Sequence, residues 1–204
     1  MIVVVDYGTA NLKSVANAID LLGHEVKISK KVQDLEQAER IVLPGVGTFA
    51  EGMKNLIDLK LKDALVSEII QKKKPFLGIC LGLHLLATTG YEGGITPGLN
   101  FIPGEVKQFD LKGLRIPHMG WDQVSFRKQI PLWDEVKDNT DLYFVHKYHF
   151  IPKNAEDIAA VCDYGGEFVT AVQKDNIFAT QFHPEKSQED GLKILENFCR
   201  WNPC

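Results

Sequence analysis

The chain has 204 residues, of which 45% are hydrophobic and 25% are charged, a balance typical of a soluble globular protein with a good core. The net charge is −4, and the sequence contains no block of like charges. Both features argue against nucleic acid or an anionic membrane as the main partner. Four cysteines without a C-x-x-C pair disfavour a zinc site or a disulfide framework, and the N-terminal apolar run is too short for a signal peptide. We therefore expect one domain over residues 1–204, without metal or cofactor, in a reducing cytoplasm.

The first half of the chain alternates short apolar strands with amphipathic helices. We expect strands at residues 2–5, 25–29, 40–43 and 76–79, and helices at residues 11–22 and 53–73, with Pro44 ending the third strand. This alternation predicts an α/β fold with a doubly wound, mostly parallel sheet. Right-handed crossovers then place a ligand outside the carboxyl ends of the strands, where Gly8, Gly45 and Cys80 fall.

The second half has frequent glycines and prolines and shorter strands. Strands are expected at residues 105–109, 141–145, 158–162, 169–173 and 177–182, with a hairpin turn at 174–176 and a closing helix at 191–201. The second half should therefore add antiparallel strands to the parallel sheet.

A sharp turn between a strand and a helix carries the first candidate catalytic residue. Cys80 follows the buried strand at residues 76–79, and a helix is expected from Leu81 to Ala87. Gly78 and Gly82 flank the cysteine at a distance of two residues, where Cβ atoms would collide in so tight a turn. This is the pattern of a nucleophile elbow, with free N–H groups of the helix favouring a thiolate. A buried structural cysteine on a glycine-rich turn is the alternative.

His183 is the histidine best placed to serve as a base for Cys80. It follows a strand end, as Cys80 does, and Glu185 lies two residues further on. In an extended segment these two side chains point to the same face, so the carboxylate can orient the imidazole. The three residues together predict a nucleophile, a base and an orienting group.

A third segment, Gly45-Val46-Gly47, follows the third strand and is predicted to turn backbone N–H groups towards the thiol. A phosphate-binding loop is rejected, because the third glycine of G-x-G-x-x-G is absent and no Lys-Ser/Thr pair follows. An ordinary loop remains the alternative.

These motifs, in this order, resemble the class I (triad) glutamine amidotransferases and, more narrowly, the glutaminase subunits of imidazole glycerol phosphate synthases. The resemblance covers nearly the whole chain. It rests on Asn11-Leu12 with Ser14-Val15, Pro44-Gly45-Val46-Gly47, Gly78-Ile79-Cys80-Leu81-Gly82, Pro117-His118-Met119-Gly120-Trp121, Phe144-Val145-His146, Ala171-Val172-Gln173-Lys174 and Gln181-Phe182-His183-Pro184-Glu185-Lys186-Ser187.

The resemblance implies a type 1 glutamine amidotransferase domain in which Cys80 is the nucleophile, His183 the general base and acid, and Glu185 the orienting residue. It also implies that Val46 and Leu81 supply the oxyanion N–H groups. The expected partner is a (βα)₈-barrel cyclase, bound as a heterodimer, that receives the ammonia released from glutamine. Its expected interface residues on this chain are His118, Met119, Gly120, Trp121, Tyr148 and Lys186.

Three residues depart from the family pattern. His84 replaces a glutamine that contacts substrate, Lys147 replaces a serine or threonine, and Asp122 replaces an asparagine. These changes leave the glutaminase chemistry intact, but they leave open a second acceptor, a sugar amidotransferase of surface-polysaccharide synthesis. A stand-alone cysteine hydrolase and a catalytically silent binding subunit are the alternatives from other classes of protein.

Overall fold

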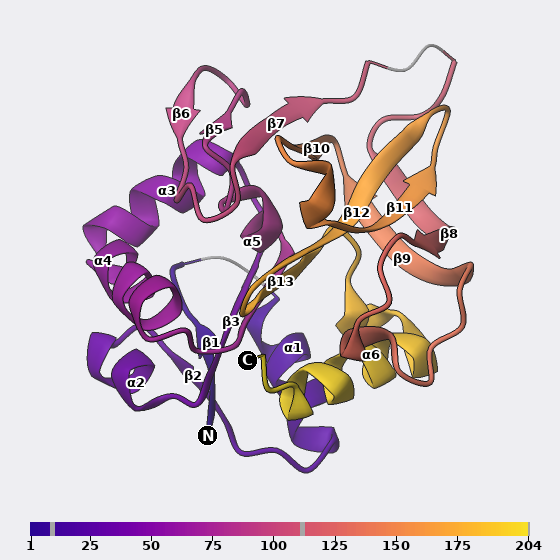
Figure 1. Cartoon of the computed structure of the whole chain (residues 1–204). Helices are drawn as coiled ribbons and strands as arrows, with labels where there is room; N and C mark the ends of the chain where they lie inside the picture. Colours follow the sequence, from indigo (N-terminus) through magenta and orange to yellow (C-terminus); the bar gives the residue numbers. More distant parts are fainter. Residues whose placement is uncertain (9–10, 111–112, 204) are drawn as a thin grey trace.

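A nine-stranded mixed sheet forms the centre of the molecule (Figure 1). The computed structural model describes residues 1–8, 11–110 and 113–203. Five neighbouring strands run parallel, and four antiparallel strands extend one side of the sheet. The order is β2 (Val26–Ser29), β1 (Ile2–Val5), β3 (Arg40–Gly45), β4 (Phe76–Cys80), β13 (Ile177–Thr180), β12 (Glu167–Lys174), β11 (Ile158–Asp163), β8 (His118–Phe126) and β9 (Thr140–His146).

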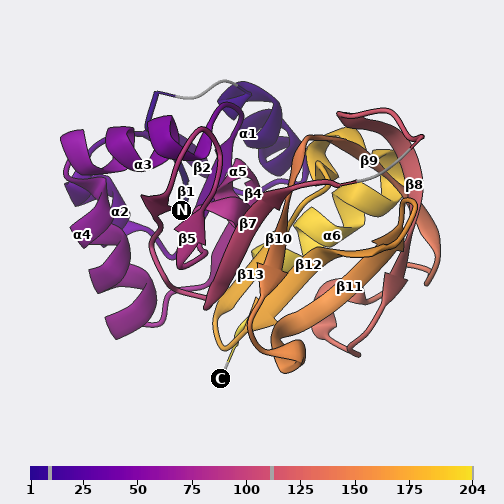
Figure 2. The same ribbon diagram turned by 90° about the horizontal axis from the view of Figure 1, so that it is seen from above.

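Helices cover both faces of the parallel part of the sheet, as Figure 2 shows from above. One face carries α2 (Val32–Gln37), α3 (Phe49–Asp58), α4 (Leu61–Leu65) and the π-helix Val66–Gln71. The other carries α1 (Leu12–Leu21) and α6 (Gln188–Arg200). This arrangement confirms the predicted α/β class and the doubly wound parallel core.

A second, four-stranded sheet lies beside the carboxyl end of β4. Its order is β10 (Tyr148–Pro152), β7 (Gly104–Gln108), β5 (Thr89–Gly90) and β6 (Thr96–Pro97). Three short 3-10 helices complete the elements, at Pro131–Trp133, Ala155–Asp157 and Pro184–Lys186. The short helix α5 (Leu81–His84) packs against β10, so this small sheet forms part of the surroundings of Cys80.

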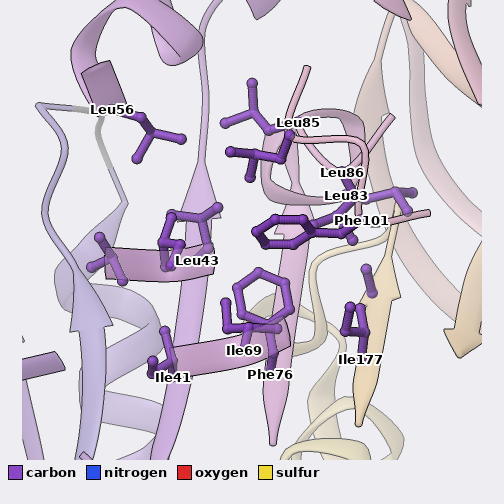
Figure 3. Packing of buried hydrophobic residues seen from close by; sticks show 14 of the residues in the cluster. Ile41, Leu43, Leu56, Ile69, Phe76, Leu83, Leu85, Leu86, Phe101 and Ile177 are labelled. Atoms are coloured by element: carbon purple, nitrogen blue, oxygen red, sulfur yellow. The ribbon is translucent and has the colours of Figure 1, made fainter. Parts of the chain in front are cut away.

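The core between the sheet and the α2–α4 layer is built from residues in register. Ile41, Phe76 and Ile177 are paired neighbours on β3, β4 and β13. Figure 3 shows them in one cluster with Leu43, Leu85 and other apolar side chains. Complete burial of these side chains is worth roughly 1.5–3 kcal/mol each, so the strand end that carries Cys80 stands on a firmly packed base.

Three expectations about element boundaries were wrong. The strand predicted to stop at Pro44 continues to Gly45, because β1 pairs with β3 only as far as Val42 and no ladder bond to β1 needs an N–H at Pro44. The helix predicted over residues 81–87 ends at His84 and continues as turns.

The helix predicted over residues 53–73 consists of three shorter pieces and begins earlier. Thr48 caps α3, its Oγ1 accepting a hydrogen bond from the Glu51 N–H at 3.3 Å. Lys60 then adopts a left-handed conformation with φ 58°, and this break lets Leu61 turn into the core. A continuous helix would have kept the wrong face inward.

Other sequence predictions were confirmed. Gly23, with φ 81°, follows the end of α1. Lys174 pairs with Ile177, so the hairpin between β12 and β13 has a two-residue loop. Strands β8 and β10 were not predicted.

No helix in the described residues is both long and apolar enough to cross a membrane.

Candidate active site

Cys80 is held in a strained turn where β4 meets α5. Its φ of 54° and ψ of −105° lie in a region that residues with a Cβ seldom occupy. A Cβ on Gly82 would lie 1.8 Å from the Leu43 carbonyl oxygen, and one on Gly78 would lie 2.9 Å from the Gly82 backbone. Only glycines allow the helix to approach the sheet this closely, so the flanking glycines predicted for an elbow have the expected mechanical cause.

The candidate base and its orienting residue lie together at the end of β13. His183 Nδ1 and Glu185 Oε1 are 2.8 Å apart, and both side chains are almost completely buried. The sequence analysis expected an extended segment here, and that expectation was wrong. The two side chains meet through the 3-10 turn Pro184–Lys186. Asn11, at the start of α1, donates a second hydrogen bond to Glu185 Oε1 at 2.6 Å. Asn11 therefore fixes the position of the Glu185 carboxylate, which in turn orients the His183 imidazole.

His183 is electrostatically coupled to Cys80. Burial lowers the pKa of the imidazole, but interactions with the Cys80 thiol and the Glu185 carboxylate outweigh burial and raise it to about 10. Since Nδ1 is engaged with Glu185, Nε2 is the ring atom left to interact with Cys80, and among the described residues it forms no hydrogen bond. A histidine coupled to a cysteine in this way can serve it as base and acid.

A cavity of about 350 Å³ opens next to Cys80, a volume typical of a site for a small molecule. His183 is not part of its wall and approaches Cys80 from the buried side. The cavity is lined by Val46, Gly47, Thr48, Cys80, Leu81, His84, Glu92, Pro117, Val145, His146, Lys147 and Tyr148.

The loop predicted to hold oxyanion donors forms one wall of this cavity. Gly47 has φ 123°, which a residue with a Cβ would resist. Gly45 has a different reason to be glycine, because a Cβ there would lie 2.0 Å from the Tyr7 hydroxyl oxygen. The position of Val46 and Leu81 on the cavity wall agrees with the predicted donors, whose role stays a prediction.

Two residues outside the predicted triad also bear on the site. Glu92 lies on the cavity wall, and its Oε2 accepts a hydrogen bond from the Phe49 N–H at 2.8 Å. Sequence reasoning missed it, since Tyr91-Glu92-Gly93-Gly94 looks like any polar loop. Gln181 is fully buried and lies between His84 and Cys80, with its Oε1 2.7 Å from His84 Nε2.

The family model for glutamine amidotransferase class-I matches residues 3–201. This chain belongs to the class I glutamine amidotransferase family. A relative from Campylobacter jejuni strain RM1221, named imidazole glycerol phosphate synthase subunit HisH 1, is 49% identical over 201 residues, which cover 98% of this chain and 100% of the relative.

Other relatives carry the same name. Subunit HisH of Aquifex aeolicus is 46% identical over 199 residues, which cover 97% of this amidotransferase and 95% of the relative. Subunit HisH 2 of Pseudomonas aeruginosa is 42% identical over 199 residues, which cover 97% and 98% of the two chains.

Solved structures agree with the fold. A crystal structure of a glutamine amidotransferase has a TM-score of 0.75 at 19% identity, covering 97% of this chain and 98% of that one. The structure of PurLQS from Thermotoga maritima has a TM-score of 0.74 at 18% identity, covering 98% and 97%. At such identities these structures support the architecture alone.

The residues expected at a partner interface of this amidotransferase divide into two groups. Met119 is 65% exposed and Trp121 is 42% exposed, so both are open to a partner. Gly120 lies between them with φ 147°, Tyr148 is half-buried, and Lys186 is exposed with its Nζ 5.7 Å from the centre of the Tyr143 ring.

His118 lies inside this face and not on it. It is 1% exposed, with Nδ1 3.0 Å from His146 Nε2 and its own Nε2 2.6 Å from Asp122 Oδ2. His146 Nδ1 donates in turn to the Tyr148 carbonyl oxygen at 2.8 Å. A chain of hydrogen bonds thus runs from the half-exposed Asp122 to the cavity wall.

Proposed function

We propose that this amidotransferase is the glutaminase subunit of an imidazole glycerol phosphate synthase of histidine biosynthesis. It hydrolyses glutamine and passes ammonia to a (βα)₈-barrel cyclase, which makes imidazole glycerol phosphate and AICAR from a phosphoribulosyl-formimino intermediate. The observation that carries the proposal is the convergence of Cys80, His183 and Glu185 beside a small-molecule cavity, in a chain similar over its length to HisH subunits.

The reaction follows from the protonation states at the site. The Cys80 thiolate attacks the carboxamide carbon of glutamine, and the carbonyl electron pair moves to oxygen. We expect the N–H groups of Val46 and Leu81, two residues of the cavity wall, to hold this oxyanion, each worth about 10²–10³ in rate. His183, protonated at neutral pH, gives its Nε2 proton to the departing nitrogen, and ammonia leaves a thioester behind. Water, deprotonated by His183, then releases glutamate.

The cavity also contains a charge suited to an amino acid. Glu92 is the carboxylate on its wall, placed to pair with the α-ammonium group of glutamine. His84 occupies the position of the family's substrate-contacting glutamine and lies on the same wall.

A partner is required by the chemistry of the product. Free ammonia near neutral pH is mostly protonated and then no longer a nucleophile, so a second protein has to receive it through a dry passage. Met119, Trp121, Tyr148 and Lys186 form the docking face we propose, with an aromatic and methionine composition enriched at interface cores. We expect the heterodimer to work in the reducing cytoplasm, where a free thiol survives.

The decisive experiment measures glutamate release from glutamine by this chain alone, then with a barrel cyclase of the same organism and its nucleotide ligand. Strong stimulation supports the proposal. Cys80→Ala should abolish glutamine-dependent product while ammonia-dependent synthesis continues. Cys162→Ala, at a buried thiol of β11 whose pKa burial raises to about 12, is the matched control and should keep both activities. Loss of both activities in Cys80→Ala would refute the division of labour.

The alternative acceptor is a sugar amidotransferase. It is left open by His84, Asp122 and Lys147, the three residues that depart from the family pattern. A competent cyclase that gives no stimulation, followed by stimulation with the sugar amidotransferase, would select it.

A further inference from the structure

The buried Gln181 is the feature of the site that the proposed mechanism does not use. It is completely buried, and its backbone N–H donates to the Thr170 carbonyl oxygen at 2.7 Å, which fixes the segment against β12. Its side-chain amide lies between two groups from the elbow. Oε1 is 2.7 Å from His84 Nε2, and Nε2 is 3.9 Å from Cys80 Sγ. No other described side-chain amide forms a hydrogen bond with the nucleophile.

The orientation of this amide follows from counting hydrogens. Burial lowers the pKa of His84 to about 4, the hydrogen bond with Gln181 notwithstanding, so the ring is neutral at pH 7 and carries one N–H. If His84 Nε2 carries that hydrogen, it donates to Gln181 Oε1, and the amide NH₂ faces the sulfur. If Nε2 lacks it, the amide is reversed and its oxygen faces the sulfur.

The charge of a cysteine nucleophile selects between these two arrangements. A cysteine reacts as its thiolate, and a thiolate only accepts hydrogen bonds. An amide oxygen facing a thiolate would be repelled, whereas an amide N–H is attracted. The three groups are therefore consistent with one another only when His84 donates to Gln181 and Gln181 donates to Cys80.

We propose that Gln181 is a positioning residue for the nucleophile, that its amide N–H stabilises the Cys80 thiolate, and that His84 fixes the amide in this orientation. The contact of 3.9 Å is long, as hydrogen bonds in an unliganded catalytic site often are. This role explains why position 84 has a histidine. A side-chain amide at this position could flip and present its oxygen to Gln181, whereas an imidazole has no oxygen to present. It rests on Cys80 being the nucleophile of the proposed function.

The test is the rate of Cys80 alkylation by iodoacetamide between pH 6.5 and 9, followed on the full chain by peptide-resolved mass spectrometry. Neither glutamine nor a partner is needed, so a failure here is distinct from a failure of the proposed function. Burial lowers the pKa of His84, His146 and His149, so these neighbours keep their charge over this range.

Gln181→Leu should slow alkylation at pH 7 about tenfold and leave the rate at high pH unchanged, because a hydrogen bond to the ionised group is lost. Gln181→Glu should slow it further, since an acceptor of the same shape replaces the donor. Gln173→Leu is the matched control, since its amide donates to the Asp175 carbonyl oxygen, and should match the parent. A folded Gln181→Leu variant with the parent profile would overturn the proposal. If that variant lacks a cooperative melting transition, Gln181→Met replaces it.

The part played by His84 has its own test. His84→Leu should slow alkylation at pH 7 about threefold, and the double variant with Gln181→Leu should be no slower than Gln181→Leu alone. A His84→Leu profile identical to the parent, or effects that multiply in the double variant, would show that His84 does not act through Gln181.

Discussion

Acid should destabilise this amidotransferase through His84, and the size of the effect follows from its burial. Burial lowers the pKa of His84 from 6.5 to about 4. Between these two pH values His84 is therefore protonated in the unfolded chain and neutral in the folded protein. The unfolded state binds more protons below pH 6.5, and stability therefore falls as the pH falls through that value. Between pH 7 and pH 5 the loss from this residue alone is about 2 kcal/mol, at 1.36 kcal/mol per pH unit.

His84→Gln removes the titrating group and restores the residue typical of the family. The measurement is the free energy of unfolding by urea at pH 7 and at pH 5, for the parent and the variant. The quantity compared is the change in the free energy of unfolding between pH 7 and pH 5, in which any pH-independent cost of the substitution cancels. This change should be about 2 kcal/mol smaller in the variant than in the parent. His24→Gln, at a partly exposed histidine beyond α1, controls for the loss of one histidine. An acid dependence equal to that of the parent would refute the reasoning.

Three further predictions concern the elbow and the triad. Gly82→Ala should lower the free energy of unfolding by at least about 3 kcal/mol, measured by urea denaturation, because its Cβ would lie 1.8 Å from the Leu43 carbonyl oxygen. Glu185→Gln should lower glutaminase kcat about 10³-fold or more. It should also reduce the loss of stability that the parent shows as pH rises through about 10, because Glu185 is one of the two groups, with Cys80, that raise the pKa of His183. Asn11→Gly keeps the left-handed backbone and removes the hydrogen bond to Glu185, so glutamate release should slow about tenfold, and an unchanged rate would contradict a positioning role.

The triad was predictable because its signals are local. The elbow occupies seven consecutive residues, and His183 and Glu185 are two residues apart, so each half shows itself in a short window. The two halves were joined because each follows a strand end, whereas β13, expected among the antiparallel strands, is in fact a parallel neighbour of β4. Asn11 and Gln181 had no such signal, since their partners lie 174 and 101 residues away in the chain.

The errors have physical reasons of the same kind. Hydrophobic periodicity over residues 53–73 could not reveal that Lys60 turns left-handed, because the break depends on packing Leu61 against the sheet. The strand His118–Phe126 lacks a regular alternation, because Asp122 and Gln123 are adjacent polar residues, and it is a strand because β9 pairs along nearly its whole length. In both cases a contact with another element decided the local structure.

The three departures from the family gather on one side of the site. His84 and Lys147 line the cavity, and Asp122 reaches it through His118 and His146. Two imidazoles bonded in series between a carboxylate and a carbonyl oxygen need three hydrogens, one more than two neutral rings supply. Position 122 therefore belongs to a hydrogen-bond chain in which an asparagine would offer a different set of donors and acceptors.

The opposite side of the site, formed by His183, Glu185 and Asn11, keeps the contacts that hydrolysis needs. Lys147 and Asp122 thus lie apart from the triad, whereas His84 reaches Cys80 through Gln181. An acceptor docked on Met119 and Trp121, as we propose, would meet the side that carries Lys147 and Asp122, and not the triad. We therefore expect Asp122→Asn to shift stimulation of glutamate release towards the cyclase, without changing the alkylation rate of Cys80.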